Sequence, residues 1–407
     1  MLNNGNIEMN YVVAGFLLFL LTACSLQSST ATNDTKTNNT ETNIAVLQVA
    51  NNVFDQSQPN TLGLQKPAQI AHHLVFKAKA GSAQYNHGAV LFAFNGELFI
   101  QWQSSQQDED APETKILYSR SSNGNDWSEP QQLVAARTDA LVTNGGWWRY
   151  RDTLVAFINV WPQDLQPKAG YVEYITSRDG SHWSKPKPLL DYAGKPVAGV
   201  IEQDLKQLPN GRILTAIHHQ PGLIAKPFYT DDATGLSGWT QGEMENLPHQ
   251  PGISRELEPS WFLTKQLKQQ QPVMVFRDQG SSFTLLAARS NDNGKTWTKP
   301  TATNMPDSRA KQSAGNLPDG RAFLINNPSG TKNRAPLTIT LSSDGQLFDK
   351  AYLLRSESEL PLMLYAGKYK RTGYSYPKSI VWNNRVWVSY AVNKEDIEVT
   401  SMAVENL

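Results

Sequence analysis

The stretch Ser290-Asn291-Asp292-Asn293-Gly294-Lys295-Thr296-Trp297 decides the fold, because related stretches recur along the chain and each closes on an aromatic residue. The other copies are 121–127, 177–183, a looser one at 230–239, and 342–348. The five closing aromatic residues stand 56, 56, 58 and 51 residues apart. A repeat of this length is typical of one supersecondary unit that is copied in space, such as the blade of a β-propeller.

Tight-turn signals lie between the copies, and an apolar strand follows each turn. Asn-Gly and Asp-Gly pairs favour hairpins because they adopt positive φ at low cost. The turns lie at 95–96, 151–152, 210–211, 269–271, 319–320 and 383–384, and the strands follow at 98–102, 154–158, 213–217, 273–276, 322–325 and 386–390. Six such units without a helical period predict an all-β fold, a six-bladed β-propeller with four antiparallel strands in each blade.

The sixth unit lacks an outer motif of its own. The segment 72–77 precedes the first blade and has the composition of a strand. We expect this N-terminal strand to complete the sixth blade and close the ring, which would remove an exposed sheet edge. The propeller domain is then expected from Pro67 to Leu407.

The motif Ser-x-Asp-x-Gly-x-x-Trp resembles the Asp-box, or BNR repeat, of sialidases and their relatives. It is complete at 290–297 and one residue shorter at 177–183. The segment from Asn333-Arg334-Ala335-Pro336-Leu337 to Tyr374-Ser375-Tyr376-Pro377 also looks like the end of a BNR sialidase-like domain. The resemblance covers roughly residues 85–399 and implies a sialidase-like propeller that acts on carbohydrate. The Asp-box itself is expected to be a structural turn without a catalytic role.

The N-terminal segment is expected to direct secretion. The apolar run Val12–Leu21 is too short for a stable membrane anchor, and it leads into Leu21-Thr22-Ala23-Cys24. This sequence resembles the lipobox of bacterial lipoproteins, which implies a signal peptide over residues 1–23 and a lipid on Cys24. No Lys or Arg precedes the run, which departs from the usual pattern. An ordinary signal peptide with a chance cysteine is the alternative.

Composition limits the partners and the location. Ser25 to about Asn43 is polar and poor in residues to bury, so residues 24–66 are expected to be a flexible tether. The 37 basic and 37 acidic residues leave no net charge to attract nucleic acid. A single cysteine excludes a disulfide framework and a Cys-based zinc site. We expect a monomer in the bacterial cell envelope that contacts the membrane only through its lipid.

The resemblance also implies an active site where the inner strands meet at the channel mouth. Sialidases use a tyrosine nucleophile assisted by a glutamate, a separate aspartate as acid/base, and three arginines that bind a carboxylate. Tyr376 falls at the nucleophile position, and Tyr374 is the alternative. Glu256 and Glu258 precede the inner hairpin of the fourth blade, at the position of the assisting glutamate. Strand alternation places both on one side, where their mutual repulsion would raise one pKa.

The acid/base candidates are Asp108 and Asp110, in the loop that follows the strand ending at Trp102. The run Asp108-Glu109-Asp110 also has the oxygen ligands of a calcium site, although it lacks EF-hand spacing. It is equally consistent with a solvated loop tip. No cofactor is expected, and calcium stays open.

The arginine positions depart from the family pattern. Arg334 matches the third position and carries a forked donor suited to a carboxylate. The first position holds Tyr85-Asn86-His87-Gly88, and the second corresponds to Ser281-Ser282-Phe283, with Arg277 close by. Ordinary sialic acid is therefore not the expected substrate.

Other residues are candidates for binding sugar. His87, beside Asn86, is expected at the channel mouth, and His218 and His219 end an inner strand of the third blade; histidine acts as acid, base or ligand near neutral pH. Trp147-Trp148 is expected either as a stacking platform at the rim or as part of the interface between blades.

Three functions follow from these residues. The first is an exo-acting glycoside hydrolase on an acidic or decorated glycan, with Tyr376, Glu256 or Glu258, Asp108 or Asp110, and Arg334. The second is a lyase on uronates that uses His87, Tyr376 and Arg334, whose product would absorb ultraviolet light. The third is a glycan-binding lipoprotein without catalysis.

Overall fold

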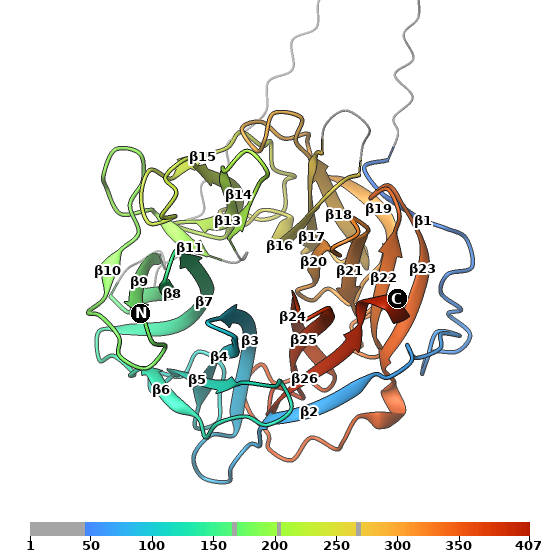
Figure 1. Cartoon of the computed structure of the whole chain (residues 1–407), viewed down its shortest axis with the longest axis horizontal. Helices are drawn as coiled ribbons and strands as arrows, with labels where there is room; N and C mark the ends of the chain where they lie inside the picture. The colour runs from blue at the N-terminus through green and yellow to red at the C-terminus, as the bar shows by residue number, and fades with distance from the viewer. Residues whose placement is uncertain (1–44, 165–168, 202–204, 266–269) are drawn as a thin grey trace, which may run out of the picture. The chain divides into compact units, whose positions relative to one another are not determined.

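The computed structural model describes residues 45–164, 169–201, 205–265 and 270–407. The predicted signal peptide, Cys24 and the first part of the tether lie outside these residues. The described chain forms six antiparallel sheets around a common axis (Figure 1). The prediction of an all-β, six-bladed propeller is therefore confirmed.

Each sheet is one blade, with its strands in order from the axis outward (Figure 1). Blade 1 contains β3 (Tyr85–Phe94), β4 (Glu97–Ser105), β5 (Lys115–Ser121) and β6 (Gln131–Val134); blade 2 contains β7 (Ala140–Tyr150), β8 (Thr153–Pro162), β9 (Tyr171–Ser177) and β10 (Lys187–Pro188). Blade 3 contains β11 (Gly199–Ile201) and β12 (Lys206–Gln207), which both pair with β13 (Ile213–His219), then β14 (Ile224–Thr230) and β15 (Thr240–Gln241).

Blades 4 to 6 complete the ring. Blade 4 contains β16 (Glu256–Leu263), β17 (Pro272–Asp278), β18 (Thr284–Arg289) and β19 (Thr301–Pro306); blade 5 contains β20 (Ser313–Asn316), β21 (Ala322–Asn326), β22 (Leu337–Ser342) and β23 (Leu347–Arg355). Blade 6 contains β24 (Tyr374–Trp382), β25 (Arg385–Val392), β26 (Asp396–Ala403) and β2 (Ala71–Phe76). The described helical turns are η1 (Glu357–Glu359) and η2 (Val404–Asn406), and no helix in this part of the chain is long and apolar enough to cross a bilayer.

The N-terminal strand closes the ring as the sequence predicts. β2 pairs antiparallel with β26, with His72 opposite Thr400, and so becomes the outer strand of blade 6. The folded part nevertheless begins earlier than Pro67. β1 (Gln48–Val49) adds in parallel to β23, and Leu47 is buried beside it. The expected tether boundary is too late because a two-residue strand gives no periodic signal.

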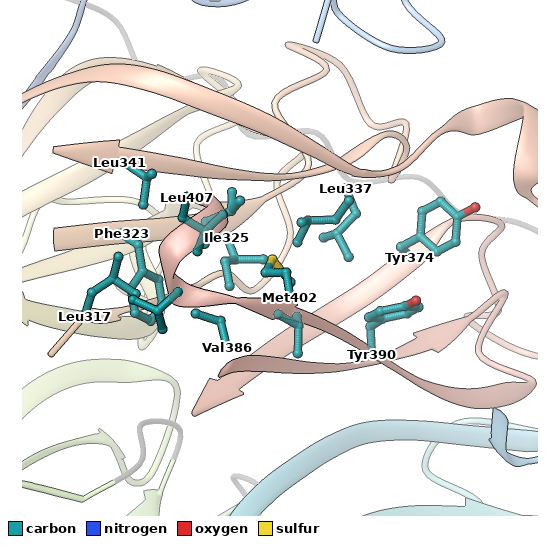
Figure 2. Packing of buried hydrophobic residues seen from close by; sticks show 14 of the residues in the cluster. Leu317, Phe323, Ile325, Leu337, Leu341, Tyr374, Val386, Tyr390, Met402 and Leu407 are labelled. Atoms are coloured by element: carbon teal, nitrogen blue, oxygen red, sulfur yellow. The ribbon is translucent and has the colours of Figure 1, made fainter. Parts of the chain in front are cut away.

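The core consists of clusters between neighbouring blades. Figure 2 shows the cluster between blades 5 and 6, in which Phe323, Ile325 and Leu341 face Val386 and Met402. Each sheet is apolar on both faces, so each blade is buried only when both neighbours are present. All six sheets and the six described clusters lie within residues 45–407. This part of the chain forms one compact unit with the core it needs to fold on its own.

The Asp-boxes set the spacing between blades. In the copy at 177–183, Ser177 Oγ accepts a hydrogen bond from the Gly180 amide at 2.9 Å, and Asp179 Oδ1 accepts one from the His182 amide at 2.8 Å. Gly180 has φ +71°, and a Cβ there would lie 2.4 Å from Cζ of Phe99 in blade 1. Gly124 and Gly294 touch Trp387 and Leu214 of their preceding blades in the same way. The repeated glycine is thus an inter-blade contact.

Substitution Gly180→Ala should lower the free energy of unfolding by about 2 to 4 kcal/mol, because a left-handed backbone and a clash with Phe99 act together. Gly194→Ala is the matched control, since Gly194 has φ +74° but a Cβ added there would meet no atom within 4 Å. We expect this control to lose only about 1 kcal/mol. Urea unfolding of both variants measures the difference, and equal losses would show that the Asp-box contact is not an interlock between blades.

Candidate active site

Four inner strands carry a β-bulge where they approach the axis. The bulges lie between His87 and Val90 in β3, Asn144 and Gly146 in β7, Leu257 and Ser260 in β16, and Ser375 and Lys378 in β24. A bulge re-aims a side chain that strict alternation would send elsewhere. Residues at all four bulges line one cavity of about 750 Å³ at the centre of the ring.

The central contact in this cavity joins Tyr376, Glu258 and Arg277. The Tyr376 hydroxyl donates a short hydrogen bond to Glu258 Oε1. Arg277 Nη1, from β17, donates to Glu258 Oε2 at 2.6 Å and to the Tyr376 oxygen at 3.1 Å. Its Nη2 is fixed by Gln279 at 2.8 Å. A phenol, a carboxylate and a guanidinium from blades 4 and 6 therefore form one hydrogen-bonded group.

Two residues of this group have strained backbones. Glu258 has φ +51° and Tyr376 has φ +57°, conformations that cost non-glycine residues about 1 to 3 kcal/mol each. The Glu258 amide donates to Nε2 of His218 at 3.1 Å, and its carbonyl accepts from Nε2 of Gln312 at 3.1 Å. Because buried side chains bond both the backbone amide and the backbone carbonyl of Glu258, its carboxylate stays directed toward Tyr376.

The environment keeps Tyr376 protonated. Enclosure by the protein, followed by the charge of Glu258, raises the pKa of Tyr376 far above its ordinary value, while Arg277 and Arg334 act in the opposite direction. A free phenolate is therefore not the resting state. The phenol can lose its proton only to a base in direct contact, and Glu258 is in that position.

Cations surround the tyrosine ring. Arg334 Cζ lies 5.2 Å from the centre of the Tyr376 ring, and Lys311 Nζ lies 5.7 Å from it. Arg334 is buried and donates to Ser375 Oγ at 3.0 Å, so it supports the ring rather than lining the cavity. Lys311 and Lys378 do line the cavity. Cations therefore gather around the Tyr376 ring, while its hydroxyl contacts the Glu258 carboxylate.

His87 also packs against the Tyr376 ring, with 4.3 Å between the two ring centres. It is buried, and burial, with added repulsion from Lys394, Arg334 and Lys311, holds its pKa well below the ordinary value. The imidazole is therefore neutral at pH 7. Among the described residues, neither ring nitrogen has a hydrogen-bond partner.

The acidic loop contributes one candidate acid/base. Asp110 is exposed and lines the cavity, with φ +61°. Glu109 also lines it but is ion-paired with Lys394. Asp108 accepts the Lys368 amide at 2.7 Å and lies outside the cavity lining. Within the described ranges, no three His, Cys, Asp or Glu side chains gather as a metal site.

Glu256 does not share a side with Glu258. Its carboxylate is buried and accepts the Leu247 amide at 2.6 Å and Asn246 Nδ2 at 3.3 Å. The expectation of two neighbouring carboxylates was wrong because the bulge after Leu257 breaks the alternation of β16.

The structure places several other candidates away from the cavity lining. The Asn86 side chain is buried and bonded to the Ala83 and Glu395 carbonyls, at 3.0 and 2.7 Å. The Tyr374 hydroxyl donates to the Ser356 carbonyl at 2.9 Å.

The tryptophan pair lies between blades. Trp147 is buried between blades 1 and 2 and donates to the Val90 carbonyl at 3.0 Å. Trp148 is half-buried and donates to the Thr234 carbonyl at 2.9 Å. The tryptophan pair is thus an inter-blade element and not a rim platform.

The two histidines at the end of β13 differ in position. His219 is half-buried, whereas His218 lines the cavity.

Sequence reasoning missed Gln312, Lys311 and Lys378. Gln312 Nε2 bonds the carbonyls of both Glu258 and Val275, at 3.1 and 2.9 Å. These residues belong to no motif. Lys311 and Gln312 lie just before β20 and Lys378 lies within β24, and only these positions at inner strands could have suggested them. Arg277, a candidate for binding substrate because it lies near the second arginine position, lines the cavity and contacts Glu258 and Tyr376 directly.

A buried carboxyl supports the loop that carries Lys311. Asp307 accepts the amides of Arg309 and Ala310 at 2.8 and 3.3 Å and Nδ2 of Asn326 at 3.2 Å. Burial nevertheless raises the pKa of Asp307 to about 6, because the charged form is poorly solvated.

The six-bladed ring with its Asp-boxes defines a structural class, the sialidase-like β-propellers. The chain belongs to the BNR repeat-like domain family, whose model matches residues 96–388. No curated protein matches the chain.

Three solved structures illustrate the likeness in fold. A sialidase matches with a TM-score of 0.60 and 17% identity over 88% of this chain, which spans only 35% of that protein. The intramolecular trans-sialidase of Ruminococcus gnavus matches with a TM-score of 0.60 and 12% identity, over 82% of this chain and 97% of the other. An α-L-arabinofuranosidase of Fusarium graminearum matches with a TM-score of 0.56 and 11% identity, over 83% and 98%.

Asp307 should make the stability depend on pH. Because its folded pKa of about 6 exceeds the unfolded value of 3.8, the folded state holds a proton that the unfolded state releases between these values. The contribution of Asp307 to the free energy of unfolding should therefore fall by about 2 kcal/mol as the pH rises from about 4 to about 7. Asp307→Asn should remove this fall, as measured by denaturant unfolding at both pH values. If the free energy of unfolding depended on pH in the same way in the variant and the wild type, a raised pKa of Asp307 would be contradicted.

Proposed function

We propose that this protein is an exo-acting glycoside hydrolase that removes an acidic or decorated sugar, other than ordinary sialic acid, from the end of a glycan. The observation that carries the proposal is the hydrogen bond from the Tyr376 hydroxyl to Glu258, with Arg277 bonded to both, at the wall of a cavity that could hold a sugar. The same contacts favour Glu258 over Glu256 as the assisting base.

The first step would transfer the sugar to the enzyme. The Tyr376 oxygen attacks the anomeric carbon while its proton passes to Glu258, which overcomes the raised pKa of the phenol. Arg277 stabilises the negative charge that passes through the phenol oxygen and the carboxylate. The bond from the anomeric carbon to the leaving oxygen breaks, and Asp110 donates a proton to that oxygen.

The second step would release the sugar. Asp110, now a carboxylate, takes a proton from water as the water oxygen attacks the anomeric carbon. The bond to Tyr376 breaks and its oxygen recovers the proton from Glu258. Exposure at the cavity edge suits Asp110 to this exchange with solvent, whereas Asp108 is engaged by the Lys368 amide.

Three acidic and three basic side chains line the cavity, and the basic ones near the Tyr376 ring support an acidic substrate. Arg277, Lys311 and Lys378 line the cavity, and Arg334 lies behind the tyrosine ring. The neutral His87 stands where the sialidase resemblance calls for an arginine, which argues against the three-arginine grip on sialic acid. The matching arabinofuranosidase is named for a sugar other than sialic acid, so the fold accommodates other substrates. No comparable contact favours the lyase, because both His87 nitrogens are enclosed.

We also propose that the chain is a lipoprotein of the bacterial envelope, on the basis of the lipobox-like Leu21–Cys24 sequence. Wild-type protein expressed in bacteria with labelled palmitate should incorporate the label, and Cys24→Ser should not, because the acyl group needs the thiol. Equal labelling of the two proteins, or none in either, would contradict lipidation at Cys24.

Tyr376→Phe should lower kcat by about 10³-fold or more on a cleavable aryl glycoside, because the nucleophilic oxygen is removed. Tyr374→Phe is the matched control and should keep its activity, since Tyr374 bonds the Ser356 carbonyl outside the cavity. A panel of aryl uronides, arabinosides and sialosides first identifies a substrate.

Glu258→Gln and Glu256→Gln separate the two carboxylates in the same assay. Only Glu258→Gln should match the loss in Tyr376→Phe. Products with an ultraviolet-absorbing double bond would establish the lyase instead. Sugar binding by the wild type without turnover of any substrate, unaffected by Tyr376→Phe, would establish the non-catalytic alternative.

A further inference from the structure

Exposed apolar side chains concentrate in one loop. Residues 361–371, the apolar loop, connect η1 to β24. Leu362 is 86% exposed, Leu364 64%, Tyr369 60% and Met363 38%. Of the other described residues, only Leu74, Tyr192 and Leu347 are large apolar residues with exposed side chains, and they lie singly in other parts of the ring. Contiguous exposed apolar groups mark an interaction site, whereas single ones are ordinary.

The base of the apolar loop is held rigidly. The carboxylate of Glu395 accepts the amides of Leu364 and Tyr365 at 3.0 and 2.7 Å, and it also pairs with Lys370 Nζ at 3.0 Å. The side chains of Lys370 and Glu395 are almost fully buried. Asn393 Nδ2 holds the Pro361 carbonyl at 2.9 Å. The apolar side chains are therefore presented to solvent by a fixed backbone, which lowers the entropy lost when they bind.

The apolar loop lies beside the cavity. Gln107 Nε2 donates to the Ala366 carbonyl at 3.2 Å, the Lys368 amide donates to Asp108 at 2.7 Å, and the Glu109 amide donates to the Lys368 carbonyl at 3.3 Å. These contacts join it to the acidic loop that brings Asp110 to the cavity. A surface that engages the apolar loop would thus meet the same end of the ring as the cavity.

The charges of the apolar loop are all positive. It contains Lys368, Lys370 and Arg371 and no Asp or Glu, and Lys368 and Arg371 are exposed. Lys370 is neutralised by Glu395, so the two exposed cations stand beside the apolar side chains. Apolar groups next to Lys and Arg are the composition that enters the interface of an anionic bilayer.

We propose that the apolar loop docks the propeller on the surface of an anionic phospholipid bilayer, with Leu362, Met363 and Leu364 entering the interface and Lys368 and Arg371 meeting the headgroups. A protein partner fits less well, because a stable interface uses about 20 to 30 residues on each side. A sugar also fits less well, because three of the four exposed side chains are aliphatic and offer no flat ring.

Such docking adds a membrane contact to the lipid anchor expected from the sequence. It is independent of the proposed hydrolysis, since it uses none of Tyr376, Glu258 or Asp110. It would hold the cavity end of the propeller next to the membrane, whereas a lipid on a tether alone leaves the orientation free.

Residues 45–407, which fold as one unit and lack the anchor, provide the test. Co-sedimentation with phosphatidylcholine vesicles that contain phosphatidylglycerol should show binding that weakens at high salt and with phosphatidylcholine alone. Leu362→Asp combined with Leu364→Asp should weaken binding by about tenfold or more, because two leucines that would enter the bilayer interface are lost. Tyr192→Asp is the control, since Tyr192 is 76% exposed elsewhere, and it should bind as the wild type does.

A labelled thiol reports the contact directly. Residues 45–407 contain no cysteine, so Leu362→Cys provides one site for an environment-sensitive dye. Its emission should shift to the blue when the anionic vesicles are added, and the same dye on Tyr192→Cys should not respond. Thermal unfolding of each variant confirms that the fold is retained.

Several results would overturn the proposal. These are the absence of vesicle binding by the wild type, equal binding by the double aspartate variant, or an equal dye response at both positions. A dimer that the double variant dissociates would identify a second copy as the partner. Loss of activity on a soluble glycoside, with vesicle binding unchanged, would assign the apolar loop to the glycan. Activity of the wild type is unaffected by any failure of the vesicle experiment, so the two proposals fail separately.

Discussion

Closure of the ring is the constraint on which the rest of the structure depends. Each blade is apolar on both faces and becomes buried only between two neighbours, so a first and a last blade must meet. The chain achieves this with β2, which joins β26 and completes blade 6 from the N-terminal side. The cavity follows from closure, because Glu258 and Tyr376, which lie far apart in the sequence, come into contact only when six inner strands surround one axis.

The stability of this frame permits strain at the site. Glu258 and Tyr376 both have left-handed backbones at bulges, and an isolated sheet would relax such bulges toward regular pairing. Here His218 and Gln312 hold the Glu258 amide and carbonyl, while Arg277 joins the two side chains. The strain is thus balanced by hydrogen bonds from blades 3, 4 and 5, which links the geometry of the Tyr376–Glu258 contact to the packing of the ring.

The repeats made the fold predictable, and local irregularities limited prediction of the site. Asp-boxes and turns repeat at one period, so blade number and the closing strand followed from the sequence. Glu256 was misplaced because alternation assumes a regular strand, and a bulge lies one residue later. Asn86 was misplaced, and Trp147 was left open between a rim platform and the blade interface. A polar or aromatic residue near an inner strand serves inter-blade packing and sugar binding equally well in sequence. The Pro361-Leu362-Met363-Leu364 stretch reads as an ordinary apolar segment, since only the structure shows that its side chains face solvent.

The identity of residue 87 is best explained by the charges that surround it. Lys394, Arg334 and Lys311 already repel a proton on His87, so an arginine at this position would add another enclosed cation to the same wall. Such a cluster is stable when a substrate carboxylate occupies it, but it is costly in the empty cavity because like charges repel strongly where solvent is scarce. A neutral imidazole avoids that cost and leaves Arg334 and Arg277 to support the tyrosine. The neutral imidazole therefore adds no further cation beside the contact between Tyr376 and Glu258, both of which Arg277 already bonds.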